Sequence, residues 1–128
     1  MIAIDLPKAL WLSSNQRLCR PDEWSRTAAI RALAKAATTK ALTRGTEQPL
    51  SIAAVLVTVC YPPKVSRADP PNAWPAAKAA IDGAVDAGLL PDDSSAHLPV
   101  TSFARGKGTG KPGMYRLELT FTEQRLDF

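Results

Sequence analysis

Acidic residues flank an Ala-rich segment in the second half of the chain. Asp69 lies before this segment, Asp82 within it, and the pair Asp92-Asp93 after it. Clustered carboxylates are what a Mg²⁺ site needs, because this hard cation takes oxygen ligands and is usually held by one or two carboxylates together with waters and a substrate phosphate. These residues therefore point to metal-dependent phosphate chemistry. A simpler interpretation is also open, because Asp before Pro and Asp-Asp before Ser-Ser are typical of solvated turns.

The spacing of the charged residues adds two expectations. Lys78 precedes Asp82 by four residues, so both side chains share one face if this segment is a helix. A weak surface ion pair and a catalytic lysine both explain that spacing. Neighbours in extended chain point to opposite sides, so only one of Asp92 and Asp93 is expected to face a shared site. His97 is the only histidine and has no Ser or Cys motif around it, so we expect a structural role.

Two helices are expected to position these residues. The segment 22–43 lacks Gly and Pro, is rich in Ala and is followed by Gly45, which predicts a helix with a glycine stop. A second helix is predicted over 75–87, stopped by Gly88. The side chains expected to form the buried stripe of the first helix are Ile30, Leu33, Ala37 and Ala41.

Four segments have the composition of strands, namely 2–6, 50–61, 97–103 and 115–122. Segment 50–61 is apolar on both alternating faces, which predicts a central strand covered on each side. The Gly- and Lys-rich segment 105–113 is expected to be the tip of a hairpin. The order β-α-β-α-β-β predicts one α+β domain over residues 1–128, with helices packed on a mixed sheet.

This order bears on the acids as well. Asp69 follows the central strand and Asp93 immediately precedes the next one. If those two strands are neighbours, both acids can lie at one edge of the sheet.

Composition narrows the class of protein. The chain has 128 residues, of which 45% are apolar and 22% charged, as is usual for one globular domain and unlike a disordered chain. The formal net charge of +4 is compatible with nucleic-acid binding but is weak evidence for it. Two distant cysteines suggest neither a disulfide framework nor a zinc site. Without a long apolar run or a signal-peptide pattern, we expect a cytoplasmic protein with no membrane partner.

Several motifs occur in a fixed order along nearly the whole chain. They are Ser14-Asn15-Gln16-Arg17, then Pro62-Pro63, Asp69-Pro70-Pro71-Asn72, Lys78, the segment IDGAVDAG at 81–88, Asp92-Asp93, and RLELTFTE at 116–123. No single piece is specific, but the ordered set resembles the RusA family of Holliday junction resolvases, which phages and prophages often encode.

The resemblance implies a homodimeric endonuclease that depends on Mg²⁺, with Mn²⁺ as an alternative, and nicks branched DNA during recombination and repair. It implies Asp69, Lys78 and Asp93 as catalytic residues, and Asp69, Asp92 and Asp93 as metal ligands. The family's acidic motif is Asp-x-Asp-Asn, and this chain has Pro71 at the second Asp. Asp82 could replace the missing carboxylate, because it shares the Lys78 face.

Contacts to the DNA backbone are expected from residues of the Pro-dense connection and the Gly- and Lys-rich segment. The candidates are Lys64, Arg67, Asn72, Arg105, Lys107 and Lys111. No small-molecule cofactor is expected, and a phage-encoded protein of this kind would act in the bacterial host cytoplasm. Two other classes stay open: a catalytically silent protein that binds branched DNA, and a small interaction module unrelated to DNA.

Overall fold

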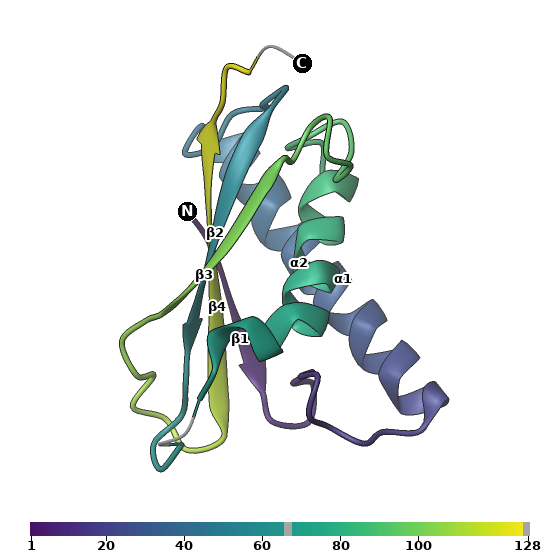
Figure 1. Cartoon of the computed structure of the whole chain (residues 1–128), viewed down its shortest axis with the longest axis vertical. Coiled ribbons are helices and arrows are strands. Elements are labelled where there is room, and N and C mark those ends of the chain that lie inside the picture. The colour runs from purple at the N-terminus through teal and green to yellow at the C-terminus, as the bar shows by residue number, and fades with distance from the viewer. Residues whose placement is uncertain (66–67, 127–128) are drawn as a thin grey trace.

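The computed structural model describes residues 1–65 and 68–126. Its elements, in chain order, are β1 (Ile2–Pro7), α1 (Arg20–Arg44), β2 (Ala53–Cys60), the 3₁₀ helix η1 (Pro70–Ala73), α2 (Trp74–Asp86), β3 (Val100–Arg105) and β4 (Met114–Glu123). The predicted order of strands and helices and the α+β class are therefore confirmed. Figure 1 shows the sheet on one side of the molecule and both helices on the other.

The four strands form one mixed sheet in the order β1-β4-β2-β3. β4 pairs antiparallel with both β1 and β2, whereas β2 and β3 are parallel. The expected hairpin at 105–113 is therefore wrong, because β3 and β4 are not neighbours. The connection instead passes the end of β2, where Gly106 N–H donates to the Val59 carbonyl at 2.9 Å and Thr109 N–H to the Tyr61 carbonyl at 3.0 Å.

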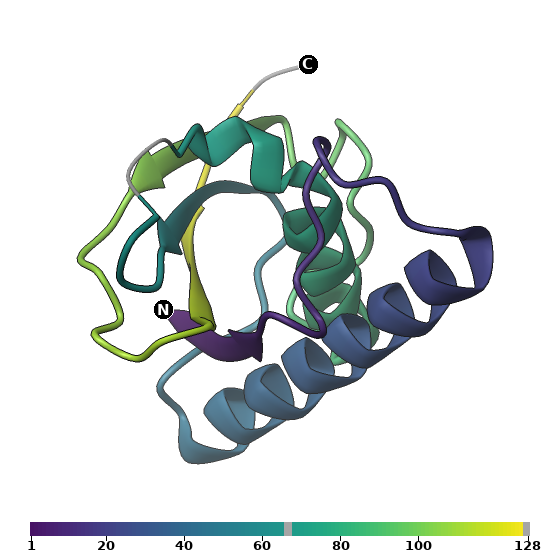
Figure 2. The ribbon, with the colours of Figure 1, turned by 90° about the horizontal axis from the view of Figure 1, so that it is seen from below.

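Both helices cover the same face of the sheet (Figures 1 and 2). Val57 of β2 and Leu117 of β4 are fully buried on that face. Leu56 and Val100 belong to the other face, where they are 38% and 47% exposed. The expectation that β2 is covered on each side is therefore wrong, because no described helix packs on the second face.

The expected ends of α1 agree with the structure, but its buried stripe differs. Gly45 ends the helix in the left-handed conformation, with φ of 76°. The fully buried residues are Ile30, Ala34 and Thr38, while Leu33 is 42% exposed. This spacing follows the four-residue ridge of a helix, the row of side chains that packs into the groove of a neighbouring helix.

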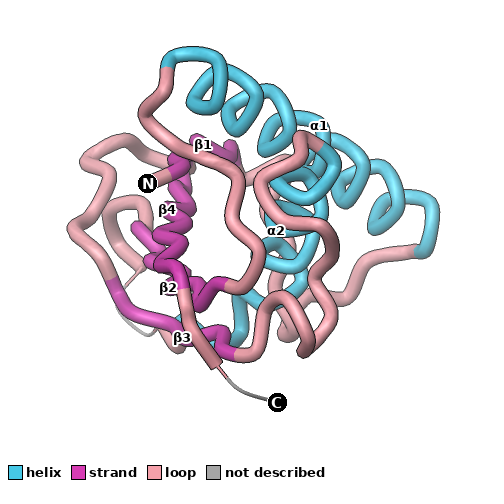
Figure 3. The backbone as a smooth tube through the Cα atoms, turned by 90° about the horizontal axis from the view of Figure 1, so that it is seen from above, coloured by secondary structure: helices cyan, strands magenta, loops and turns pink. Residues whose placement is uncertain are grey.

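The small residues of α2 allow it to lie close to α1 (Figure 3). A Cβ atom at Gly83 would lie 2.3 Å from the Arg31 carbonyl oxygen and 2.8 Å from Ala34 Cβ, so only glycine fits there. The neighbouring residues Ala80 and Ala84 are fully buried. This close contact fixes the helix that carries Lys78 and Asp82.

Candidate functional site

A tight turn after β2 presents a lysine in an unusual backbone conformation. Val65 N–H donates to the Pro62 carbonyl at 3.4 Å, which closes a four-residue turn over Pro63 and Lys64. Lys64 has a φ of 72°, the left-handed value that this position of a type II turn requires and that glycine usually supplies. A side chain in this conformation costs about 1 kcal/mol. Such local strain is typical of functional sites.

This turn and the chain after β3 enclose a groove of about 450 Å³, which we call the basic groove. Its lining residues are Tyr61, Pro62, Pro63, Lys64, Val65, Arg105, Gly106, Lys107, Gly108 and Gly110. No acidic residue occurs among these described lining residues. One surface therefore brings together three of the expected DNA-contact residues, which are up to 43 positions apart in sequence. They are Lys64, Arg105 and Lys107. Lys111 is exposed outside this lining, and Arg67 lies outside the described residues.

Arg105 joins the two walls of the basic groove. Its guanidinium donates to the Val65 carbonyl at 3.1 Å. The same group lies over the Tyr61 ring, 5.1 Å from the ring centroid. These contacts hold the turn after β2 against the end of β3, so the positive charge of Arg105 has a fixed place in the groove.

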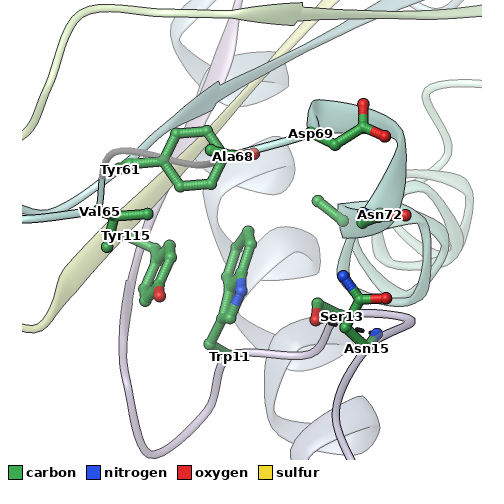
Figure 4. Close-up of a pocket in the computed structure, with 10 residues that line it drawn as sticks. Trp11, Ser13, Asn15, Tyr61, Val65, Ala68, Asp69, Asn72 and Tyr115 are labelled. Atoms are coloured by element: carbon green, nitrogen blue, oxygen red, sulfur yellow. Dashed lines mark hydrogen bonds between the residues drawn. The ribbon is translucent and has the colours of Figure 1, made fainter.

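A second cavity, of about 420 Å³, adjoins the basic groove, and we call it the aromatic cavity. Its lining residues are Trp11, Ser13, Asn15, Tyr61, Val65, Ala68, Asp69, Asn72, Ala73 and Tyr115 (Figure 4). Tyr61 and Val65 line both hollows, so the two lie side by side. Asp69 and Asn72 therefore lie beside the groove that gathers the basic residues.

Two motifs that are far apart in sequence form one wall of the aromatic cavity. Ser14 N–H donates to the Asn72 carbonyl at 2.8 Å, which ties the Ser-Asn-Gln-Arg segment to η1. Asn72 N–H in turn donates to the Asp69 carbonyl at 2.9 Å. Tyr61 lies across the cavity from this wall, and burial raises the pKa of its hydroxyl. The positive charge of Arg105 opposes this rise, whereas the negative charge of Asp69 adds to it.

The sequence indicated only part of this cavity. Trp11, which belongs to none of the motifs named above, stacks on Tyr115 with a centroid distance of 4.1 Å and an interplanar angle of 6°. Trp74, the tryptophan nearest the acidic loop in sequence, instead makes an edge contact with Phe103 at 6.3 Å and is absent from the described lining. The sequence feature that could have indicated Trp11 is its position three residues before the Ser-Asn-Gln-Arg motif. This motif is hydrogen-bonded to η1 through Ser14 and Asn72.

Lys78 brings two carboxylates together beside α2. Its Nζ donates to Asp82 Oδ1 at 2.7 Å and also to Asp93 Oδ2. Burial alone would lower the pKa of Lys78, but the hydrogen bonds to both acids outweigh burial and raise it. The hydrogen bond from Lys78 lowers the pKa of Asp93, against the opposing effect of burial. Lys78 is therefore a cation at neutral pH, and Asp93 an anion.

Of the two tandem acids, Asp93 is the one that contacts Lys78. Asp92 is exposed, and its Oδ1 accepts the Asp93 backbone N–H at 2.8 Å. His97 lies elsewhere, with Nδ1 2.9 Å from the Ser51 carbonyl oxygen, a contact that joins two loops.

The structure does not pair Asp69 with Asp93. β2 and β3 are neighbours, as the expectation required, but they run parallel. The end of β2 and the start of β3 therefore lie at opposite ends of the two strands. Between the two acids runs the 13-residue helix α2, which is about 20 Å long. Within the described part of the chain, no hydrogen bond or ion pair joins Asp69 to Lys78 or Asp93. The expectation that both acids lie at one edge is therefore wrong.

The two carboxylates beside α2 supply oxygen donors, the type of ligand that hard divalent cations take. The ammonium group of Lys78 already bridges the carboxylates of Asp82 and Asp93. Two carboxylates are sufficient, because Mg²⁺ retains waters and takes further oxygens from a phosphate. Over residues 1–65 and 68–126, no group of three or more His, Cys, Asp and Glu side chains is placed to hold a metal ion. Any such site would therefore depend on few protein ligands.

Comparisons of the sequence with protein-family models and with curated proteins find no match. No helix in the described part of the chain is long and apolar enough to cross a membrane. The site offers two surfaces for chemistry: the basic groove with the aromatic cavity, and the Lys78 cluster, which we define as Lys78, Asp82 and Asp93.

Proposed function

We propose that this chain is a metal-dependent endonuclease that nicks branched DNA such as Holliday junctions, as its resemblance to the RusA family implies. The observation that carries the proposal is the contact between Lys78 and Asp93. These two positions are 15 residues apart, and the resemblance names both as catalytic. If Asp92-Asp93 were only a solvated turn, Asp93 would not need a lysine from α2 as its partner. The contact therefore favours a charged site over a simple turn.

Asp93 and Asp82 would hold Mg²⁺ or Mn²⁺, with Asp82 in place of the carboxylate that Pro71 lacks. When bound, the ion would neutralise charge on the scissile phosphate and make a water more acidic. Without a metal ion, the hydrogen bonds to Asp82 and Asp93 raise the pKa of Lys78, so its side chain is a cation. Its ammonium can therefore stabilise negative charge that develops on the phosphate oxygens, and it is a poor choice for a general base.

The basic groove would bind the DNA backbone at the end of β2, apart from the Lys78 cluster. Lys64 and Lys107 are exposed on its rim, and Arg105 is fixed in its wall. Contacts to phosphates fix the position of DNA without reading its sequence, as a structure-specific nuclease requires. Asp69 and Asn72, at the adjoining cavity, would face DNA held in the groove.

A homodimer is part of the proposal, because symmetric nicks across a four-way junction need two equivalent sites. The open face of the sheet exposes Leu56 and Val100, and apolar side chains of this kind are common at dimer interfaces. Sedimentation equilibrium of the purified chain tests this part. A monomer at micromolar concentration, with and without junction DNA, would contradict it.

The test of the active site is a set of charge-neutral variants assayed on a labelled four-way junction with Mg²⁺. We expect Asp93→Asn and Lys78→Ala to lower the nicking rate at least 100-fold, and Asp82→Asn to lower it similarly. Asp86→Asn is the matched control, because Asp86 lies on the same helix but pairs with Arg31 at 2.6 Å. Full activity in Asp93→Asn would refute the assignment.

A catalytically silent protein that binds branched DNA is the second candidate. It is favoured by the exposed Pro71 at the family's second acid and by the separation of Asp69 from the Lys78 cluster. This candidate predicts tight junction binding in chelator and no cut strand with Mg²⁺ or Mn²⁺.

A further inference from the structure

We infer that the aromatic cavity takes up an unpaired nucleobase of DNA whose phosphates lie in the basic groove. This inference rests on the proposed function, which it deepens by naming what the cavity recognises. The cavity volume of about 420 Å³ lies within the range of about 300–1,000 Å³ that is usual for small-molecule sites.

One wall of the aromatic cavity is a rigid set of rings. Trp11 and Tyr115 are stacked in parallel, and the Tyr61 ring meets Tyr115 edge to face at 6.0 Å. Trp11 and Tyr61 are 6% and 8% exposed, so packing fixes their positions before any ligand arrives. Flat aromatic walls are how proteins hold bases taken out of the DNA stack.

The other wall of the aromatic cavity carries polar side chains. Figure 4 shows Asp69, Asn72, Ser13 and Asn15 on the side opposite Tyr61 and Tyr115. Among the described residues, the side-chain amides of Asn15 and Asn72 and the carboxylate of Asp69 make no hydrogen bond. An amide offers both a donor and an acceptor, which is the pattern needed to pair with the edge of a base.

The position of the aromatic cavity suits one strand of a branched substrate. It shares Tyr61 and Val65 with the basic groove, so a strand whose phosphates contact Lys64 and Lys107 has a base-sized opening beside it. Unpaired bases cost least to extrude, because no base pair has to be broken first. DNA with unpaired bases near a branch supplies such bases, whereas perfect linear duplex does not.

The test compares two DNAs that differ in a single base. Both carry the same one-nucleotide bulge, with an adenine in one and an abasic site in the other, so the phosphate contacts cancel in the ratio of Kd values. Binding is measured by fluorescence anisotropy in chelator, which prevents cleavage. For the unmodified protein we expect roughly tenfold tighter binding of the adenine bulge, in the range usual for one stacked base.

Variants separate the base contact from the backbone contact. Asn72→Ala removes a polar contact to the base but leaves the rings, so it should lower the ratio without changing the affinity for the abasic DNA. Gln48→Ala, an exposed amide between α1 and β2, is the matched control and should keep the ratio. Lys107→Ala should weaken both complexes equally.

Two results would overturn the inference. Equal affinity of the unmodified protein for both bulges refutes the base site and leaves the proposed function standing. Failure to bind any branched DNA refutes the proposed function together with the inference.

Discussion

Replacing Gly83 with alanine should push the two helices apart. The added Cβ would lie 2.3 Å from the Arg31 carbonyl oxygen, about 1 Å short of ordinary van der Waals contact, and 2.9 Å from the Lys35 backbone nitrogen. Because these partners are backbone atoms, no side-chain rotation can relieve the overlap. The helices must separate, and Ala34 and Gly83 then lose their contact.

The size of the effect follows from two opposing contributions. Extra atoms in a packed interface cost typically 1–3 kcal/mol, with the upper end expected for a collision with backbone. Alanine favours the helical state over glycine by about 1 kcal/mol, which offsets part of this cost. We therefore expect the Gly83→Ala variant to lose about 2 kcal/mol of unfolding free energy. For a chain of 128 residues this lowers the Tm by about 7 °C.

The assay is thermal unfolding followed by circular dichroism, with urea unfolding as a second measurement. Gly108→Ala is the control, because a Cβ there would meet only the Tyr61 carbonyl oxygen at 3.6 Å, an ordinary contact. Its Tm should stay within about 2 °C of the unmodified protein. A Gly83→Ala variant that is equally stable would refute the close approach of α1 and α2.

Three further predictions concern a buried hydroxyl, an ion pair and the basic groove. Thr38 is fully buried, and its hydroxyl has no partner among the described residues. Thr38→Val should therefore add about 1 kcal/mol of unfolding free energy. A lower unfolding free energy for this variant, measured by urea unfolding, would contradict this. The lowered pKa of Asp93 means that its pairing stabilises the fold above the ordinary value of 3.8 and loses this effect as the pH falls through the folded pKa. At pH 6 the unmodified protein should therefore be more stable than Asp93→Asn by at most about 1 kcal/mol of unfolding free energy, because solvent screens the pair. A stability difference that stays constant down to pH 3 would contradict this assignment. Lys64→Ala and Lys107→Ala should each reduce the slope of log K against log salt by about 0.9 for junction binding, with Lys35→Ala as the unchanged control, and an equally steep slope would remove these residues from the interface.

The secondary structure could be predicted because local signals were strong. Gly45 marks the end of α1, and the apolar runs mark β2 and β4. The pairing of strands could not be predicted in the same way, because β3 and β4 are consecutive in sequence yet lie on opposite sides of β2. The Gly- and Lys-rich composition of 105–113 suits a hairpin and a longer connection equally well.

The same limit applies to the candidate site. The four-residue spacing of Lys78 and Asp82 was sufficient to place them on one helix face, and their ion pair agrees with it. The partner of Lys78 depended on topology, because the parallel pairing of β2 and β3 separates Asp69 from Asp93. The aromatic cavity depends on Trp11 and Tyr115, which are 104 residues apart and meet only in the folded chain.

The central claim is that this chain cuts branched DNA with the help of a divalent metal. The most direct measurement incubates the purified protein with a labelled four-way junction and with a linear duplex of the same sequence, each with Mg²⁺, with Mn²⁺ and with chelator. We expect paired nicks in the junction, present with metal and absent with chelator, and little cutting of the duplex. An intact junction in every lane, under conditions where the protein is shown to bind it, would contradict the claim and favour the silent binding protein.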